Sequence, residues 1–256
     1  MPVILRCGGD WMSQIDLYCL PYAGGSANAI YRKWAQQLDE VINIIPLELA
    51  GHGRRMSEPF HHSIEAIVDD ILNTIREQLM TNRPYALYAH SMGTVIAYEL
   101  VTAIKSAGLP QPCTLFLSGR QPVHHKYPDR NIHLLPDDDF LEEIKRIGGT
   151  PDQLFESEAL ISIFLPILRQ DYRLIEKYRF KEPVITFDSD IIFLCSDRDL
   201  LVSKPGIFEW ERYTTKFFKV YDFEGGHFFL NESWQEIVML INRYLVKHET
   251  ITDSNQ

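Results

Sequence analysis

The 256-residue sequence has little positive charge, few cysteines and no long hydrophobic run. Its formal net charge of −10 argues against nucleic acid as a partner, because phosphate binding needs a basic surface. No apolar stretch is long enough to cross a membrane, and the first residues lack the long apolar region of a signal peptide. Nucleic-acid binding and membrane insertion are therefore not expected of this chain.

Cysteine is scarce, with only Cys7, Cys19, Cys113 and Cys195 present. They form neither a CxxC pair nor a metal-ligand spacing, and the last three lie in apolar runs typical of buried strands. We therefore expect small buried hydrophobic residues rather than metal ligands. This use of cysteine fits a reducing compartment, so we expect a cytoplasmic protein that binds no metal.

The length allows one large α/β domain, which can bury a sizeable core without disulfides or metal. Residues 15–248 are expected to form it, with a flexible leader at residues 1–14 and a flexible tail at residues 249–256. Six apolar runs predict strands, and most are continuous rather than alternating, as in strands covered on both faces. These runs are residues 15–22, 41–49, 85–90, 114–119, 190–197 and 217–225.

Helical patterns separate these runs. An apolar stripe at helical spacing follows Ser63, which stands at the N-cap position, and continues to residue 79. A second stripe follows Ser91 and stops at Gly108, and a third covers residues 232–246. The alternation of strands and helices predicts an α/β fold with a mostly parallel, doubly wound sheet.

The segment at about residues 129–180 breaks this alternation, since no convincing strand occurs in it. Its pattern indicates two or three helices, and Pro166 is expected to kink or break the longest one. Because the segment lies between two core strands, we interpret it as a helical lid. The alternative is an ordinary helical insertion with no gating role.

The stretch "YAHSMGT", residues 88–94, joins a predicted strand to a predicted helix. This is the context of a nucleophile elbow, a tight turn that requires small residues two positions before and after its serine. Here these residues are Ala89 and Gly93, on either side of Ser91. The alternative is a serine that only caps the helix.

Residues far downstream favour the nucleophile. An α/β-hydrolase orders its triad as serine, acid and histidine, with the acid after a late strand and the histidine before the last helix. Asp197 and Asp199 follow the strand at 190–197, and we prefer Asp199, because Asp197 can instead cap the loop. His227 lies between the last strand and the last helix. Ser91, Asp199 and His227 are therefore the expected catalytic triad, whereas the adjacent His90 is given no catalytic role.

Hydrolysis through such a triad also needs two backbone N–H groups for the oxyanion. One should come from Met92, directly after the serine, and the other from the loop "PYAGGSA" after the first core strand. Ala23 is the donor we favour there, because Gly24 and Gly25 allow the loop to approach a substrate closely. The alternative is a plain glycine turn that leads into the next helix.

Together, several motifs of this chain resemble those of the type II (external, editing) thioesterases that accompany nonribosomal peptide and polyketide synthases. The motifs are "LYCLPYAGGSA", "LELAGHGRRMSEP", "YAHSMG", "LSGRQPVHH", "LPDDDFLEEIKRIGGTP", "FLPILRQDYRLIEKY", "SDRDLLVS" and "GGHFFL". The resemblance implies an α/β-hydrolase fold with a helical lid, acting on thioesters carried by a phosphopantetheine arm. It assigns Ser91, Asp199 and His227 to the triad and Ala23 and Met92 to the oxyanion hole.

Three positions depart from the family pattern. Ala89 replaces the usual glycine of the elbow, and Leu200 stands where proline often follows the acid. His52 occupies a position where many members have arginine, and we interpret it as structural.

The resemblance also implies partners, namely carrier domains of a synthase, with no cofactor other than the substrate's own phosphopantetheine and a monomer as the default state. Arg54, Arg55, Lys126 and Arg130 are candidate contacts for an acidic carrier. In the lid, an apolar acyl chain is expected to meet Phe140, Phe155, Phe164 and Leu165. The alternative for these four residues is packing of the lid against the core.

Other functions fit the same residues. A chain-terminating thioesterase could release a finished product such as a medium-chain acid, and a carboxylesterase could act on free esters. A catalytically inactive carrier-binding module is a further alternative, but it would have no need of an intact triad.

Overall fold

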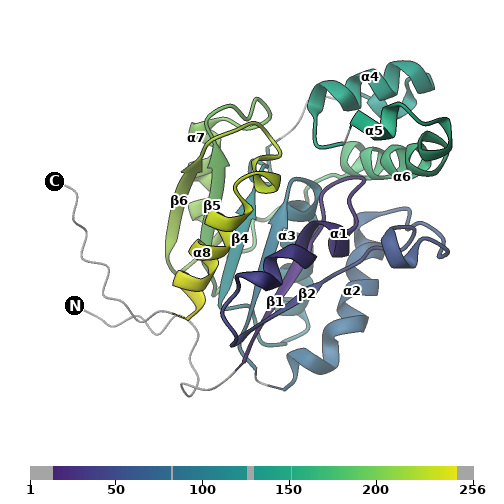
Figure 1. Cartoon of the computed structure of the whole chain (residues 1–256). Coiled ribbons are helices and arrows are strands. Elements are labelled where there is room, and N and C mark those ends of the chain that lie inside the picture. The colour runs from purple at the N-terminus through teal and green to yellow at the C-terminus, as the bar shows by residue number, and fades with distance from the viewer. Residues whose placement is uncertain (1–13, 82, 126–129, 151, 247–256) are drawn as a thin grey trace.

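The computed structural model describes residues 14–81, 83–125, 130–150 and 152–246. Six strands form one parallel sheet in the order β2-β1-β3-β4-β5-β6 (Figure 1). They are β1 (Ile15–Leu20), β2 (Ile42–Pro46), β3 (Tyr85–His90), β4 (Thr114–Ser118), β5 (Asp190–Ser196) and β6 (Phe218–Phe223). Each strand lies within one of the six predicted runs, and the predicted α/β fold is confirmed.

Burial explains why the runs are continuous. Every residue of β1, β3, β4 and β5 is buried, because these strands lie inside the sheet and helices cover both faces. Neighbouring side chains point to opposite faces, so Tyr18 and Leu20 join one core cluster while Leu17 and Cys19 join the other. The strand β6 lies at an edge and is only partly buried.

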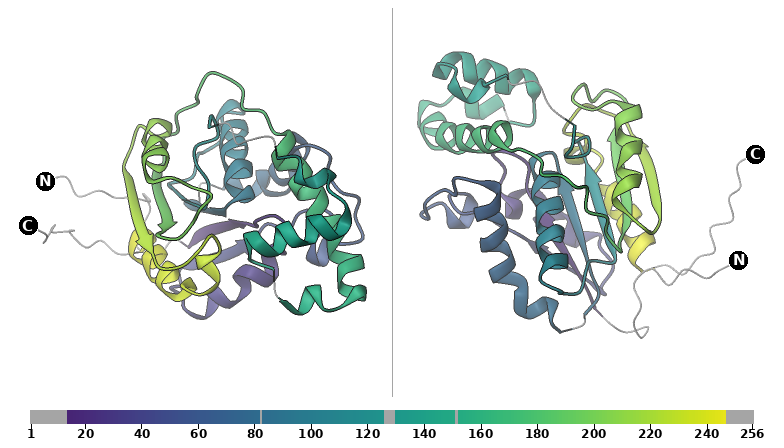
Figure 2. Two further views of the ribbon diagram at one scale, coloured as in Figure 1. Left: turned by 90° about the horizontal axis from the view of Figure 1, so that it is seen from above. Right: turned by 180° about the vertical axis from the view of Figure 1, so that it is seen from behind.

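The helices divide between the two faces (Figures 1 and 2). One face carries α1 (Ala27–Tyr31), the 3₁₀ helix η1 (Arg32–Gln36) and α8 (Trp234–Leu245). The other carries α2 (Ile64–Leu79), α3 (Met92–Ser106), and α7 (Lys204–Phe208) with η4 (Glu209–Tyr213). Two further short 3₁₀ helices, η2 (Gly53–Arg55) and η5 (Phe229–Asn231), lie in loops.

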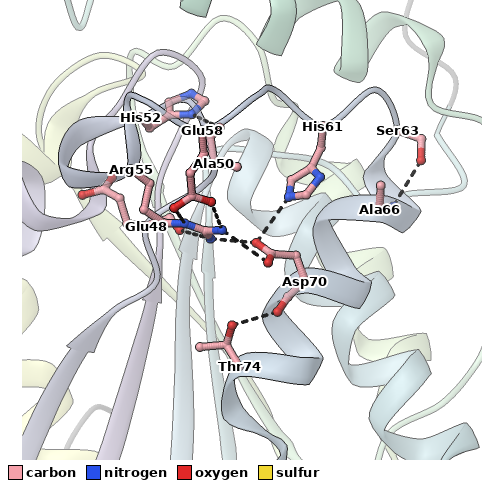
Figure 3. A network of polar contacts seen from close by, with 10 residues as sticks. All are labelled: Glu48, Ala50, His52, Arg55, Glu58, His61, Ser63, Ala66, Asp70 and Thr74. Carbon is pink, nitrogen blue, oxygen red and sulfur yellow. Dashed lines mark hydrogen bonds and ion pairs between the residues drawn. The ribbon is translucent and has the colours of Figure 1, made fainter.

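The helix ends follow the sequence signals. Ser63 Oγ accepts a hydrogen bond from the backbone N–H of Ala66 at 3.1 Å, so the predicted N-cap of α2 is present (Figure 3). The chain leaves α3 through Gly108, whose φ of 66° lies in the left-handed region that glycine adopts without strain.

The segment between β4 and β5 contains η3 (Ile132–Leu134), α4 (Asp137–Ile147), α5 (Asp152–Phe155) and α6 (Glu158–Lys177). We call these elements the helical segment. They lie together at one end of the sheet (Figure 1). We expected Pro166 to kink or break the longest helix; α6 continues through it, so the expected break was wrong, whereas the expected kink stays a prediction. Burial of Ile167 and Leu168 just after the proline anchors this part of α6 against its neighbours.

The helical segment has a small core of its own. Ile132, Phe140, Ile144 and Leu168 are buried against one another, separately from the two clusters that cover the sheet. Leu174, farther along α6, belongs to a main core cluster instead. The C-terminal half of α6 therefore joins the helical segment to the α/β domain.

The cysteines differ in part from expectation. Cys19 and Cys195 are buried free thiols, as predicted. Cys113 precedes β4, is only partly buried and is disulfide-bonded, so it is not the small buried hydrophobe that was expected. Because Cys113 is disulfide-bonded, the structure supports a reducing compartment less than the sequence does.

In the described part of the chain, no helix has both the length and the apolar character that a membrane span requires. The leader predicted at residues 1–14 and the tail predicted at residues 249–256 lie almost entirely outside the described residues.

Candidate active site

Ser91 stands at the tight turn between β3 and α3. Its backbone has φ 52° and ψ −112°, a sparsely populated region for any residue other than glycine. The turn is held by a hydrogen bond from the Ser91 N–H to the Ser118 carbonyl at 2.9 Å and another from Thr94 N–H to Ser91 carbonyl at 3.0 Å. Such a strained turn presents the serine side chain at the end of the sheet, as a nucleophile elbow does.

The small residues around Ser91 fit this geometry. A Cβ atom at Gly93 would lie 2.8 Å from the Pro21 carbonyl oxygen and 3.0 Å from that of Leu20, both backbone atoms that cannot move aside. The methyl group of Ala89, in contrast, is fully buried inside the sheet. Gly93 is therefore required by the close approach of β1, whereas alanine is accommodated at the other position.

The three predicted triad residues lie in hydrogen-bonding contact. The Ser91 hydroxyl lies 3.0 Å from His227 Nε2, and His227 Nδ1 lies 2.8 Å from Asp199 Oδ2. Since the Asp199 carboxylate accepts the N–H of Nδ1, Nε2 is left to accept the Ser91 hydroxyl proton. Asp199 Oδ1 also accepts a hydrogen bond from the Leu201 N–H at 2.9 Å, which fixes the carboxylate.

Asp197 plays a different part. Its side chain is 58% exposed and its Oδ1 accepts a hydrogen bond from the Gly225 N–H at 3.2 Å, whereas the Asp199 side chain is fully buried. Two further bonds link the same loops, from Ser196 Oγ to the Gly226 carbonyl and from the Arg198 N–H to the Gly225 carbonyl. Asp197 therefore helps to tie the loop after β5 to the loop that carries His227.

Two backbone N–H groups were predicted to form the oxyanion hole, those of Met92 and Ala23. Met92 is the first residue of α3, so its N–H has no acceptor within the helix. On the other side, Tyr22 to Gly25 form a turn closed by a hydrogen bond from Gly25 N–H to the Tyr22 carbonyl at 3.0 Å, with Gly24 at φ 76°. The hydrogen bond that closes this turn is donated by Gly25 and does not use the N–H of Ala23.

His90, next to Ser91, packs against the ring of His227. Its ring lies 4.9 Å from the His227 ring, and its Nδ1 lies 2.8 Å from the Ser118 hydroxyl. Burial lowers the pKa of His90 well below the usual value, so this imidazole is neutral. We expected no catalytic role for His90, and its position indicates that it supports the His227 ring.

A pocket of about 400 Å³ opens beside His227. It is lined by the end of α4 with the residues that follow it and by η5 with the residues on either side, namely Ile147, Gly148, Gly149, Thr150, Gly226, His227, Phe228, Phe229, Asn231 and Glu232. A Cβ atom at Gly149 would lie 2.4 Å from the Phe228 ring, so the two walls are in close contact. The pocket therefore lies between the helical segment and the loop that carries His227.

The four predicted acyl contacts do not line this pocket. Phe140 is completely buried in the core of the helical segment, beneath the Arg169 guanidinium, which lies 4.5 Å from its ring. Phe155, Phe164 and Leu165 are partly buried against the same core. In this conformation the four residues therefore pack within the helical segment itself, whereas the alternative expected from the sequence was packing of the lid against the core of the domain; their contact with an acyl chain stays a prediction.

The predicted carrier contacts have varied environments. Arg54 is exposed, whereas Arg55 is held by the carboxylates of Glu58 and Asp70 (Figure 3). Arg130 forms an ion pair with Glu143 of α4. Lys126 lies outside the described residues. Arg54 and Arg130 are thus both exposed, whereas Arg55 is only partly exposed.

Among the described residues, one group of side chains has ligand atoms close enough to share a metal ion: His124, His125 and Glu209, within 4.8 Å of one another. Both imidazoles contact the Glu209 carboxylate, at 3.0 and 3.1 Å, and His124 Nδ1 lies 2.6 Å from the hydroxyl of Tyr213. The members of this group therefore satisfy one another's hydrogen bonds. The expectation of no bound metal stays a prediction.

One buried acid near the site was not found from the sequence. Asp171 of α6 is 1% exposed, and its Oδ2 accepts hydrogen bonds from the Gly24 N–H at 2.7 Å and from His52 Nε2 at 2.9 Å. An acidic residue in the middle of an amphipathic helix normally faces solvent, so the pattern gave no sign of its burial. His52, which the sequence marked as structural, is its partner.

Comparisons with known proteins agree with this geometry. The model of the thioesterase domain family matches residues 15–245. The gramicidin S biosynthesis protein GrsT of Aneurinibacillus migulanus is 32% identical over 235 residues, which cover 91% of this chain and 90% of that protein. Thioesterase PikA5 of Streptomyces venezuelae is 31% identical over 234 residues, 91% of this chain and 82% of that protein.

A solved structure is also similar. The crystal structure of ClbQ from the colibactin NRPS/PKS pathway superposes with a TM-score of 0.86 at 38% identity, over 91% of this chain and 97% of that one. The family match and the relatives each cover nearly the whole described domain. This chain therefore belongs to the thioesterase domain family, with the α/β-hydrolase fold.

Proposed function

We propose that this protein hydrolyses acyl thioesters from the phosphopantetheine arm of carrier proteins, as an editing enzyme of a nonribosomal peptide or polyketide synthase. The observation that carries the proposal is the continuous hydrogen-bonded chain from Ser91 through His227 to Asp199. Similarity to ClbQ of an NRPS/PKS pathway and to PikA5, a thioesterase, supports this substrate class.

In the first step, Ser91 Oγ attacks the thioester carbonyl carbon while its proton passes to His227 Nε2. Asp199 holds the proton on Nδ1 and stabilises the imidazolium that forms. The negative oxygen of the tetrahedral intermediate accepts hydrogen bonds from the N–H groups of Met92 and Ala23. Each such donor is worth about 3–4 kcal/mol in related hydrolases.

The intermediate then collapses with cleavage of the carbon–sulfur bond. A thiolate leaves and takes the proton from His227, which is an easier departure than that of an amine because a cysteine-like thiol has a pKa near about 8.5. Water, deprotonated by His227, then attacks the acyl-serine ester and releases the acid. The reaction needs no cofactor beyond the arm of the substrate.

The helical segment is proposed to act as a lid. The pocket beside His227 has one wall from the end of α4, so motion of that helix would change access to His227. The acyl chain would enter along this wall rather than among Phe140 and its neighbours, which are buried.

The test uses a carrier protein loaded in turn with acetyl, long-chain and product-like acyl groups, together with a p-nitrophenyl ester. Intact mass of the carrier reports loss of each group. We expect fast loss of short acyl groups, and none with Ser91→Ala. Selective loss of one long chain would indicate product release instead, and turnover of the free ester alone would indicate an esterase. No loss from any carrier would contradict the proposal.

A further inference from the structure

The strongest unassigned feature is the link between α6 and the turn that carries Ala23. Asp171 Oδ2 accepts the Gly24 N–H at 2.7 Å, so the peptide that directly follows Ala23 is bonded to the helical segment. Leu168, one helical turn before Asp171, closes over the same glycine, since a Cβ at Gly24 would lie 2.3 Å from its side chain. Gly24 is therefore held by both a polar and an apolar contact from α6.

His52 completes this contact from a third part of the chain. It is 3% exposed, and its Nδ1 lies 3.0 Å from the Ala50 carbonyl while its Nε2 lies 2.9 Å from Asp171 Oδ2. A carbonyl oxygen can only accept a hydrogen bond, and so can an ionised carboxylate. Both ring nitrogens must then donate, which makes His52 an imidazolium paired with the Asp171 carboxylate.

From this geometry we propose that the buried His52–Asp171 pair is a positioning device for the oxyanion turn, holding Gly24 so that the N–H of Ala23 faces the thioester only while His52 carries its proton. The inference rests on the proposed function, because it assigns the Ala23 amide to the oxyanion. His52 and Asp171 touch no substrate atom in this scheme and act through the turn.

The surroundings of His52 favour its charged form. The titratable side chains that face it are Asp171 from α6, the buried Glu48 that follows β2, and His61 from the loop before α2. Burial lowers the pKa of His52, but the hydrogen bond and charge of Asp171, the Ala50 carbonyl and the charge of Glu48 outweigh this effect. The net result is a pKa of His52 above its usual value. Figure 3 shows His52 with Ala50 and Glu48 on this side of the sheet.

The raised pKa of His52 sets the direction of the pH effect. The ion pair is complete below the usual histidine pKa of about 6.5 and is lost as the pH rises through the higher pKa of the folded state. Above that pH, Asp171 becomes a buried carboxylate without a counter-charge, which favours separation of α6 from the turn. Loss of activity at alkaline pH should therefore originate at His52.

The first measurement needs no substrate. The ¹⁵N signals of the His52 ring, assigned by comparison with His52→Gln, should show both nitrogens protonated at pH 7. The amide signal of Gly24 should move when His52 titrates. A neutral ring at pH 7 would overturn the inference.

The second measurement is the pH profile of kcat/KM on acyl carrier protein. Asp171→Asn and His52→Gln should lower kcat about ten- to one-hundredfold with little change in KM, because the lost contact acts in the transition state. His52→Arg keeps a charge at every pH, so it should retain activity and remove the alkaline decline of the wild type. If Asp171→Asn fails to fold, the two His52 variants still decide the matter.

The matched control is Glu176→Gln, also on α6. Glu176 accepts hydrogen bonds from the backbone N–H groups of Ile132 and His133 and pairs with the His133 ring, all within the helical segment. This variant should keep kcat and the alkaline limb of the wild type. Equal losses in Glu176→Gln and Asp171→Asn, or an unchanged alkaline limb in His52→Arg, would refute the positioning role. If the wild-type protein hydrolyses no acyl carrier, the proposed function is contradicted instead. The ¹⁵N signals of the His52 ring would still show whether His52 is charged and paired with Asp171.

Discussion

The two sides of the active site are built by different means. On the sheet side, Ser91 follows β3, Asp199 follows β5 and His227 lies between β6 and α8. Hydrogen bonds join the loops of Asp199 and His227. On the other side, the helical segment has its own small core and reaches the α/β domain through few polar contacts. In the described part of the chain these contacts include the bonds of Asp171 and the bond from Gln170 Nε2 to the His61 carbonyl at 2.6 Å, and Leu174 packs into the main core.

This difference indicates which part of the molecule carries the reaction and which part can control access to it. A parallel sheet buried on both faces is close-packed, so groups fixed to its strand ends keep their positions. A segment with a separate small core can move as a unit when a few contacts are broken. We therefore expect changes on the sheet side to affect the reaction or global stability, and changes in the helical segment to affect access and tuning.

The largest effect is expected at Asp199. Asp199→Asn removes the acceptor that sets the His227 tautomer, so kcat should fall about 10³- to 10⁴-fold while the protein stays folded. The control is Asp197→Asn, an exposed carboxylate in the same loop, which should stay within about fivefold of wild type. Similar losses in both variants would show that the loop, rather than the Asp199 carboxylate, is what matters.

A pair of phenylalanines tests the separate cores. Phe116 lies inside β4 and Phe140 inside the helical segment, and both are completely buried. Phe116→Ala should lower the free energy of unfolding by about 3–5 kcal/mol. Phe140→Ala should instead speed amide exchange in residues 132–150 and 152–177, with a smaller change in the global unfolding midpoint in urea. Equal changes in the midpoint would mean that the segment unfolds together with the domain.

His90 gives the sheet side a pH dependence of its own. Since burial lowers its pKa in the folded state, the unfolded state binds a proton first as the pH falls below about 6.5. The free energy of unfolding should then fall by up to about 1.4 kcal/mol per pH unit relative to a His90→Asn variant. Urea unfolding of both proteins between pH 7 and pH 5 measures this difference, and parallel curves would show that His90 is protonated in the folded state.

The smallest effect is expected at the surface. Arg54→Glu places a negative charge where an acidic carrier is proposed to dock, so kcat/KM for acyl carrier should fall about two- to tenfold and depend less on salt. Turnover of a small acyl-pantetheine thioester should not change. An equal loss on both substrates would remove Arg54 from the carrier interface.

The sequence predicted the sheet and the positions of the candidate triad residues well, because both depend on local patterns. Strands buried on both faces are continuous apolar runs, and the residues around Ser91 and His227 sit in turns with few allowed conformations. These patterns placed the six strands within a few residues of their observed bounds and brought Ser91, Asp199 and His227 to one end of the sheet.

Contacts that depend on tertiary packing could not be predicted in this way. The burial of Asp171 follows from how α6 crosses the turn at Gly24, and the helical period alone does not fix that crossing. Phe140 and its neighbours were expected to line an acyl site, but an apolar stripe is equally consistent with a core. In the same way, α6 continues through Pro166 because residues before and after the proline pack against neighbouring residues.

The shared hydrogen bonds of Asp171 have a consequence for engineering and for divergence within the family. The α6 helix, the glycine turn and the loop of His52 meet at one carboxylate oxygen, so none of the three can be exchanged independently of the other two. Replacement of the helical segment by that of another thioesterase should therefore succeed only when residues 22–25 and 50–52 are replaced together with it.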